Sequence, residues 1–273
     1  MGEEARRSCK EERGRVEEAA GWTTSSRRGS LWLAKELARG HHISYRSVYS
    51  NHLTFSIPAP KTETEPTWSE AVTEEQRAQL WHLASELDAN CKITASQIAA
   101  TPKTCAITII ADPKHPAHGQ RGLFAAQDLE PDRFVCLYLG HIHRNIPSDT
   151  DPASDYDLCF DREIDLSVDA SRSGNQSRCA NDYRGIAERP NAEFRDCFVK
   201  VPCAKRAGGT KWERRVGIFV LSAGKAGKRK QGVKAGEEIL ISYGKQFWES
   251  RKTMAQVSEE FGMLKVADAA VEG

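Results

Sequence analysis

Five short runs of β-branched and aromatic residues, each bounded by glycine, proline or aspartate, constrain this chain most strongly. The runs are TCAITIIAD (104–112), RFVCLYLG (133–140), FRDCFVKV (194–201), RVGIFVLS (215–222) and EEILISYG (237–244). Short runs separated by turn residues are typical of strands in a mainly β domain rather than of a βαβ sheet. The sequence therefore predicts a mainly β fold, of α+β type, built from short β-sheets.

Helical signals lie mostly before these runs. Thr73 followed by Gln76 matches a capping box, and apolar residues then recur at helical spacing, which predicts a helix over 73–89. Residues 30–40 suggest a shorter helix. The first 29 residues are charged and rich in Ser and Gly, which is typical of a disordered or weakly helical tail.

Composition limits the classes of partner. Lys and Arg number 39 against 38 for Asp and Glu, so no overall charge attracts nucleic acid or an anionic membrane. No segment approaches the roughly 18 apolar residues of a membrane span, and the N-terminus lacks the apolar core of a signal peptide. The eight cysteines form no Cys-x-x-Cys pair, which favours reduced thiols in an intracellular protein.

Several motifs then follow one another in a fixed order. They are HGQRGLFAAQDLEPDRFVCLYLG, VDASRSGNQSRCAND, RPNAEFR, RVGIFVL and KAGEEILISYG. In order and approximate spacing these segments resemble the SET-domain protein-lysine methyltransferases, and the resemblance covers about 104–248. It implies a SET-type fold in which the Gly-Asn-x-x-Arg-x-x-Asn stretch passes under a neighbouring loop, and this knot-like crossing holds S-adenosylmethionine.

Composition and local pattern divide the rest of the chain. They predict a low-order N-terminal tail and linker over 1–66, a helical extension over 67–103 and a C-terminal helix or tail over 249–273, whereas the resemblance implies a SET-like catalytic domain over 104–248. Two inserts rich in Lys and Arg, 205–215 and 225–234, are expected to form exposed loops. Contact with an acidic patch or a phosphate backbone is the alternative for these loops.

Tyrosines carry the expected chemistry. The resemblance assigns catalytic positions to Tyr243, whose hydroxyl would orient a neutral lysine amine, and to Tyr138, which would line the lysine channel. The alternatives are a strand-end aromatic for Tyr243 and a core residue for Tyr138. Tyr156, Ile241 and Phe247 complete the expected substrate channel. In the family, the residue two before the catalytic tyrosine is commonly Phe or Tyr, and a tyrosine there holds a water in the space that further methyl groups would need. Because Ile241 cannot hydrogen-bond such a water, a di- or trimethylated product is expected.

The resemblance assigns cofactor contacts to residues of three motif loops. The first contains HGQRGLF (118–124), the second contains VDASRSGNQSRCAND (168–182), and the third contains KAGEEILISYG and the residues after it (234–248). The contact residues are Arg121, Gly122, Leu123, Arg178, Asn181, Asp182, Tyr243 and Trp248. A glycine turn lets backbone amides approach a carboxylate closely. Two positions depart from the family pattern, because the first glycine of Gly-x-Gly is displaced to Gly119 and Asp182 stands where the family has histidine. The alternatives are a plain turn residue for Asn181 and packing of Phe247 and Trp248 against a helix over 249–261.

The implied activity is methyl transfer from S-adenosylmethionine to a protein lysine without a metal. By family analogy the substrate is a histone tail and the location is the nucleus. One alternative is an inactive SET-like module that binds a peptide. The other is a methyltransferase of a non-histone protein in the cytoplasm. No membrane partner is expected, and direct contact with nucleic acid would involve only the two basic loops.

Overall fold

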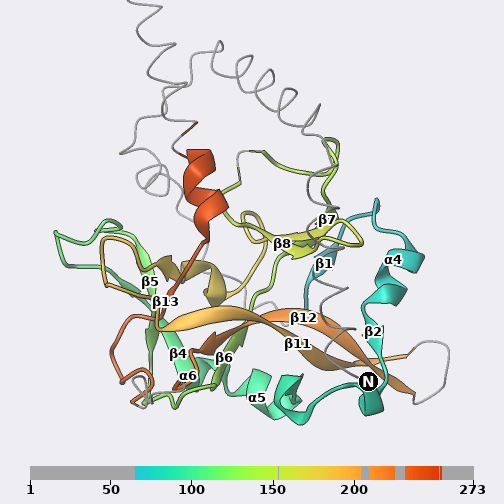
Figure 1. Ribbon diagram of the computed structural model, residues 1–273, viewed down its shortest axis with the longest axis horizontal. Helices are drawn as coiled ribbons and strands as arrows, with labels where there is room; N and C mark the ends of the chain where they lie inside the picture. Colours follow the sequence, from blue (N-terminus) through green and yellow to red (C-terminus); the bar gives the residue numbers. More distant parts are fainter. Residues whose placement is uncertain (1–64, 153, 204–208, 225–230, 252, 254–273) are drawn as a thin grey trace, which may run out of the picture. The chain divides into compact units, whose positions relative to one another are not determined.

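The computed structural model describes residues 65–152, 154–203, 209–224, 231–251 and 253. Residues 65–245 belong to one compact unit, and the residues from Gln246 onward belong to a second. Strands hold most of the regular structure in the described part of the chain (Figure 1), so the mainly β fold predicted from the sequence is confirmed. The helix expected over 30–40 and most of the one expected over 249–261 lie outside the described residues.

A long hairpin forms the centre of the largest sheet. Strands β11 (Ala192–Pro202) and β12 (Thr210–Val220) pair antiparallel along their whole length, and Figure 1 shows this hairpin running through the unit. Strands β2 (Trp81–His82) and β6 (Phe134–Leu137) add to β12, and β3 (Lys92–Ile93) adds to β11. The sequence runs at 133–140, 194–201 and 215–222 correspond to β6, β11 and β12.

A second sheet follows β6 in the chain. Its order is β1 (Thr67–Trp68), β7 (His141–Arg144), β9 (Leu166–Asp169) and β8 (Asp157–Asp161). The outer strand β1 is parallel to β7, whereas the other pairs are antiparallel. Figure 1 shows β7 and β8 beside the hairpin, and the chain that leads to them is bonded to it, since Tyr138 N–H donates to the carbonyl of Val216 just after β6 ends.

Two small strand pairs position the motif loops. Strand β4 (Cys105–Ile109) pairs antiparallel with β5 (Arg121–Ala125), and β10 (Asn181–Asp182) pairs in parallel with β13 (Leu240–Ile241). Short helices and 3-10 turns fill the connections. They are α4 (Glu74–Gln79), η2 (Ala84–Glu86), η3 (Ala89–Cys91), α5 (Ala95–Ala99), α6 (Thr101–Thr104) and η4 (Gln176–Cys179). No helix among the described residues is long and apolar enough to cross a membrane.

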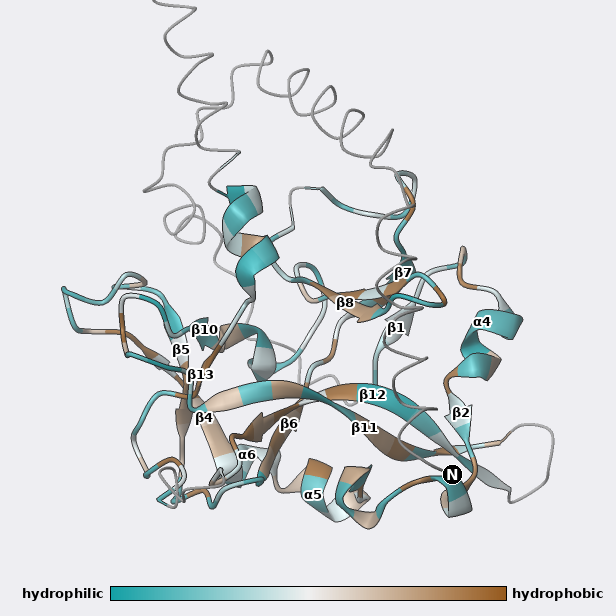
Figure 2. Cartoon of the chain, viewed as in Figure 1, coloured by the Kyte–Doolittle hydropathy of each residue, from teal (hydrophilic) through white to brown (hydrophobic). Residues whose placement is uncertain are grey.

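Buried apolar side chains form three clusters around the hairpin. Figure 2 shows mostly apolar residues along β6, whereas β11 and β12 alternate between apolar and hydrophilic stretches. The cluster nearest the motif loops contains Leu123, Ala180, Ile218 and Ile241, and Tyr243 packs against it. Each fully buried leucine or isoleucine contributes about 1.5–3 kcal/mol to folding. The motif loops are therefore supported by the main core.

The helix predicted over 73–89 is wrong in its length. Thr73 forms the predicted capping box with Gln76, but α4 ends at Gln79. The next residues join the sheet instead, because Trp81–His82 pairs with β12 and the Leu80 carbonyl accepts a hydrogen bond from Arg214 N–H. Leu83, which the pattern placed on the apolar helix face, is 66% exposed. Strand pairing has therefore taken the backbone groups that a longer helix would need.

Two further expectations are corrected. The strand expected over 237–244 contains only the two residues of β13. The insert expected over 205–215 is not a loop from Thr210 onward, because β12 begins there and pairs with β11. Residues 204–208 and 225–230 of the two inserts lie outside the described part of the chain. A hairpin strand can accommodate the Lys- and Arg-rich sequence TKWERR because alternate side chains point to opposite faces of the sheet.

Candidate functional site

Three strands that are far apart in the sequence, β5, β10 and β13, meet at one place. Strand β10 pairs with β13, with Asn181 opposite Leu240. Strand β5 meets the residues just before β13, because Ile239 N–H donates to the Leu123 carbonyl at 2.7 Å. Figure 2 shows β5, β10 and β13 next to one another. The loops predicted to hold the cofactor are thus brought to one place by backbone pairing.

The chain between β10 and β11 is bonded to β13 and the residues just before it. At one end of this loop, Tyr183 N–H donates to the Ile241 carbonyl at 3.0 Å. At the other end, the Asn191 side chain donates to the Glu238 carbonyl at 2.8 Å and accepts from Leu240 N–H at 2.8 Å. Both ends of loop 183–191 are therefore bonded to the same short segment, 238–241.

Tyr243 is bonded through its hydroxyl and through its backbone. The hydroxyl donates to the Ala180 carbonyl at 3.0 Å, and its N–H donates to Asp182 Oδ2 at 2.7 Å. The Asp182 side chain is 2% exposed and pairs with Arg184 at 3.0 Å. Asp182, at the position where the family has histidine, therefore holds the backbone of Tyr243.

Tyr138, Tyr156 and Arg178 form a connected group. The buried Tyr138 hydroxyl donates to the Tyr156 carbonyl at 2.7 Å, and burial raises the pKa of Tyr138 well above its ordinary value. The Arg178 guanidinium lies 4.5 Å from the centre of the Tyr156 ring and donates to the Ser171 carbonyl at 3.1 Å. Burial also raises the pKa of Tyr156, and the Arg178 charge offsets part of that rise. Both tyrosines are therefore neutral hydrogen-bond donors at neutral pH.

The buried carboxylate of Glu238, in the third motif loop, is bonded to residues of the second loop and of the segment before the first. Glu238 Oε1 accepts from Asn181 Nδ2 at 2.8 Å, and Glu238 Oε2 lies 3.0 Å from His115 Nε2. The His115 and Glu238 side chains are 7% and 10% exposed. Asn181 Nδ2 also lies 3.5 Å from the Arg121 carbonyl, at the limit of hydrogen bonding. Neither His115 nor Glu238 was among the residues predicted from the sequence.

Gly122 lies directly against this carboxylate. A Cβ atom at position 122 would come within 2.8 Å of Glu238 Oε1 and 2.7 Å of the Phe124 ring. Such contacts are too short for a real side chain, so the close packing of the two loops requires glycine here. Leu123, the next residue, has no exposed surface and belongs to the core.

The remaining channel residues have different surroundings. Ile241 is 1% exposed and lies in the same core cluster as Leu123. Phe247 and Trp248 belong to the second compact unit, where their rings meet edge to face with centroids 5.4 Å apart. Their expected contact with the cofactor stays a prediction, as does the role of Ile241 in the channel.

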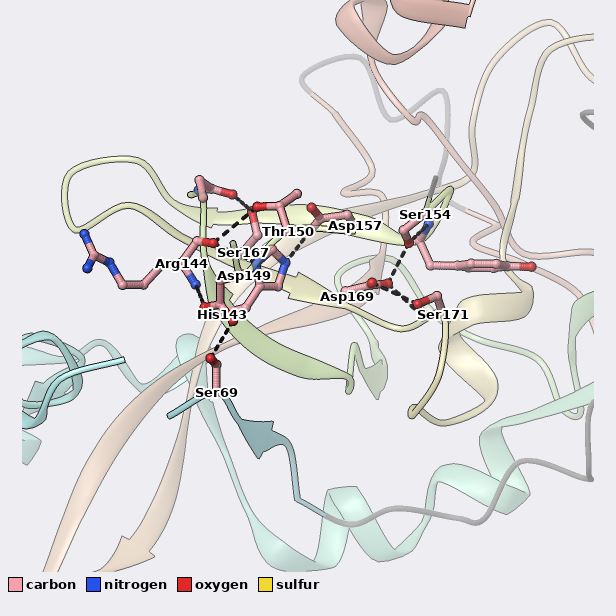
Figure 3. Close-up of polar contacts among 12 residues, drawn as sticks. Ser69, His143, Arg144, Asp149, Thr150, Ser154, Asp157, Ser167, Asp169 and Ser171 are labelled. Carbon is pink, nitrogen blue, oxygen red and sulfur yellow. Dashed lines mark hydrogen bonds and ion pairs between the residues drawn. The ribbon is translucent and has the colours of Figure 1, made fainter. Parts of the chain in front are cut away.

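A second polar group lies in the sheet formed by β7, β8 and β9. His143 is 2% exposed, and both ring nitrogens face acceptors: Nε2 is 3.1 Å from Asp157 Oδ1 and Nδ1 is 2.9 Å from the Arg144 carbonyl (Figure 3). Burial opposes the charged form of His143. The hydrogen bonds to Asp157 and to the Arg144 carbonyl outweigh it, with smaller contributions from the charges of Asp157 and Asp149, and raise the pKa to about 9.

A cavity of about 580 Å³ opens beside this group. His143, Asp149 and Asp169 are among its lining residues. The carboxylates are already bonded, since Asp149 accepts from Ser69 Oγ at 2.6 Å and Asp169 accepts from Ser154 Oγ at 2.7 Å. Among the described residues, no group of three His, Cys, Asp or Glu side chains is arranged to hold a metal ion.

The sequence offered unequal signals for the residues that it missed. Glu238 stands inside the KAGEEILISYG motif, and a buried acid beside a strand could have been singled out there. His115 lies in a loop without any motif, more than a hundred positions from Glu238. Only the tertiary structure brings this histidine to the carboxylate.

Comparisons with known proteins were made over the whole chain. No family model and no curated protein matches it. Solved structures of polycomb repressive complex 2 do match. An active complex in its stimulated state aligns with 51% of this chain at 24% identity and a TM-score of 0.33. The complex from Chaetomium thermophilum aligns with 52% at 24% identity and a TM-score of 0.35. This chain covers 15% and 16% of those two chains.

Proposed function

We propose that this chain is an S-adenosylmethionine-dependent protein-lysine N-methyltransferase of the SET type. One observation carries the proposal. The three motif loops meet beside β13, with Tyr243 bonded to the second loop through Ala180 and Asp182. Such an arrangement supports a preorganised site, because each loop is held by backbone pairing rather than by side chains alone.

The residues of the three motif loops beside β13 fit the cofactor chemically. S-adenosylmethionine carries an ammonium, a carboxylate and an adenine, and when bound it supplies a methyl group on a positively charged sulfur. Asn181 would hold the ammonium and Arg121 or Arg178 the carboxylate, because an amide oxygen accepts from a cation and a guanidinium donates to an anion. Gly122 permits the close approach of the first motif loop to Glu238, whose carboxylate is bonded to Asn181.

Tyr243 and its neighbours would act on the lysine. An ammonium has no lone pair, so the lysine must lose its proton to water before it can react. Burial disfavours the charged form of any group, and it raises the pKa of Tyr156 for this reason. A lysine side chain placed in similarly buried surroundings would likewise favour its neutral amine. The Tyr243 hydroxyl would orient that amine, and its own position is secured by the N–H bond to Asp182.

For the substrate we propose a histone tail, and for the location the nucleus, on family analogy. A non-histone protein in the cytoplasm is the alternative within the same chemistry. An inactive module that binds a peptide is the alternative outside it. Direct contact with nucleic acid would involve only the two basic segments at 205–215 and 225–234, of which the first continues into β12.

The test is transfer of a labelled methyl group. Full-length protein is incubated with labelled S-adenosylmethionine and either core histones or whole-cell extract. Tyr243→Phe should lower turnover by about a hundredfold or more, because one preorganised hydroxyl at the reacting centre is lost. Cofactor binding measured by calorimetry should remain near the parent value. Tyr183→Phe is the matched control, since its loop is bonded through the backbone.

Each alternative has its own outcome. Label on extract proteins with unlabelled histones would identify a non-histone substrate. No transfer to any substrate, with peptide binding retained, would leave the inactive module. Equal turnover in Tyr243→Phe and the parent would remove Tyr243 from the chemistry.

A further inference from the structure

We infer that Glu238, held by His115, fixes the direction of the Asn181 side-chain amide and turns its oxygen toward an N–H donor of the ligand. This inference rests on the proposed function for the identity of that ligand. It assigns a positioning role to two residues outside the predicted set, and it makes the Asn181 oxygen the acceptor for the ligand's ammonium.

The Glu238 carboxylate stands between two donors. Each of its oxygens has one side-chain partner, Asn181 Nδ2 at 2.8 Å and His115 Nε2 at 3.0 Å. The side chain is only 10% exposed, so water replaces neither donor easily. A buried carboxylate that lost one of these hydrogen bonds would pay a desolvation penalty.

The tautomer of His115 follows from its other nitrogen. Ala117 N–H donates to His115 Nδ1 at 3.0 Å, and a backbone N–H can only donate. His115 Nδ1 therefore carries no proton, so the neutral ring carries its proton on Nε2 and donates to Glu238. The Ala117 amide thus makes His115 a fixed donor.

The direction of the Asn181 amide follows in turn. An ionised carboxylate accepts and never donates, so the nitrogen of the Asn181 amide must face Glu238. Within the described residues, the hydrogen bonds of the Asn181 side chain run through Nδ2, to Glu238 and to the Arg121 carbonyl. The amide oxygen then lies on the opposite side and can accept from a ligand. An ammonium is the donor that suits it best.

An isosteric substitution at position 238 should reverse the direction of the Asn181 amide. In Glu238→Gln the amide oxygen of the new side chain would accept from His115, which can only donate there, and its NH2 group would face Asn181. The Asn181 amide would then turn its oxygen toward residue 238 and away from the ligand. Glutamate and glutamine have nearly the same shape, so the change is one of hydrogen bonding rather than of packing.

The experiment measures S-adenosylmethionine binding by calorimetry. Glu238→Gln should weaken binding about tenfold, the effect of losing one hydrogen bond to a charged group. Asn181→Ala should weaken it similarly, and the double variant should be no weaker than Asn181→Ala alone. His115→Ala should weaken binding, whereas His115→Gln, which keeps a donor, should restore most of it. Glu237→Gln is the matched control, because Glu237 is exposed and lies one residue away.

A merely structural role for Glu238 would give a different pattern. In that case the effects of Glu238→Gln and Asn181→Ala would add in the double variant, and this result would overturn the inference. Parent-like binding by Glu238→Gln would overturn it as well.

A second readout needs no ligand. In ¹H–¹⁵N spectra of the free protein, the side-chain amide signal of Asn181 should move in Glu238→Gln and stay in place in Glu237→Gln. An unmoved signal would contradict the positioning role directly. If the signal moves but the parent protein binds no S-adenosylmethionine, the proposed function fails while the orientation of Asn181 by Glu238 holds.

Discussion

Asp182 illustrates how one residue can change its role. From the sequence it was a departure from the family's histidine, with a charge that could reach the cofactor. In the structure its oxygens accept from Arg184 and from the N–H of Tyr243. A buried carboxylate needs such donors, and the proposed catalytic tyrosine supplies one of them. The departure is therefore compatible with an ordered site.

Ile241 allows a test of how many methyl groups the site adds. The side chain cannot hold a water by hydrogen bonding, so we expect the parent protein to reach di- or trimethyl-lysine. Ile241→Tyr should shift the product toward monomethyl-lysine. Ile241→Phe has similar bulk without the hydroxyl and should not. Mass spectrometry of the modified peptide at long reaction times measures the product.

The core position of Ile241 adds a stability control to this experiment. Because the side chain is 1% exposed, either larger residue should lower the free energy of unfolding, by about 1–3 kcal/mol. A parent product that stops at monomethyl-lysine with cofactor in excess would contradict the prediction. Loss of stability without any change of product would show that Ile241 does not face the channel.

At the scale of elements, α4 owes its start to local chemistry. Thr73 Oγ1 accepts from Gln76 N–H at 3.2 Å, and Gln76 Oε1 accepts from Thr73 N–H at 3.1 Å. Thr73→Ala should therefore lower the free energy of unfolding by about 1 kcal/mol in urea denaturation. Thr73→Ser keeps the capping oxygen and should stay near the parent value. Equal losses in both variants would mean that the methyl group, and not the cap, matters.

The ends of elements depended on partners far along the chain. The capping box of α4 could be read from neighbouring residues, but its end could not, because β12 competes for the backbone at Trp81 and His82. Likewise β13 is short because its neighbours are a two-residue strand and the side chain of Asn191. Local pattern predicts where a strand or helix can form, and pairing decides how far it runs.

At the scale of the whole molecule, His143 links stability to pH. Its pKa in the folded protein is about 9, against 6.5 in the unfolded chain, so the folded state binds the proton more tightly. The stabilisation is complete below pH 6.5 and is lost as the pH rises through 9. One pH unit of difference corresponds to about 1.4 kcal/mol, so the loss should be about 3 kcal/mol.

Urea denaturation between pH 6 and 9.5 measures this loss. The parent's free energy of unfolding should fall more steeply with pH than that of His143→Gln, which cannot titrate. Asp149 and Asp157 face the imidazole. Burial alone would raise the pKa of Asp149, but the hydrogen bonds from Ser69 and from the Arg144 N–H outweigh it and lower that pKa, so Asp149 adds no slope in this range. Parallel profiles for parent and variant would contradict the prediction.

Sequence alone determined the fold class and the order of the motif loops. Short β-branched runs and turn residues are local signals, and they correctly predicted β4, β6, β11 and β12 as strands. The tertiary structure alone decided which side chains meet. Hydrogen bonds act over about 3 Å, so His115 and Glu238, or Asp182 and the backbone of Tyr243, become partners only after β5 and β10 have come to lie beside β13.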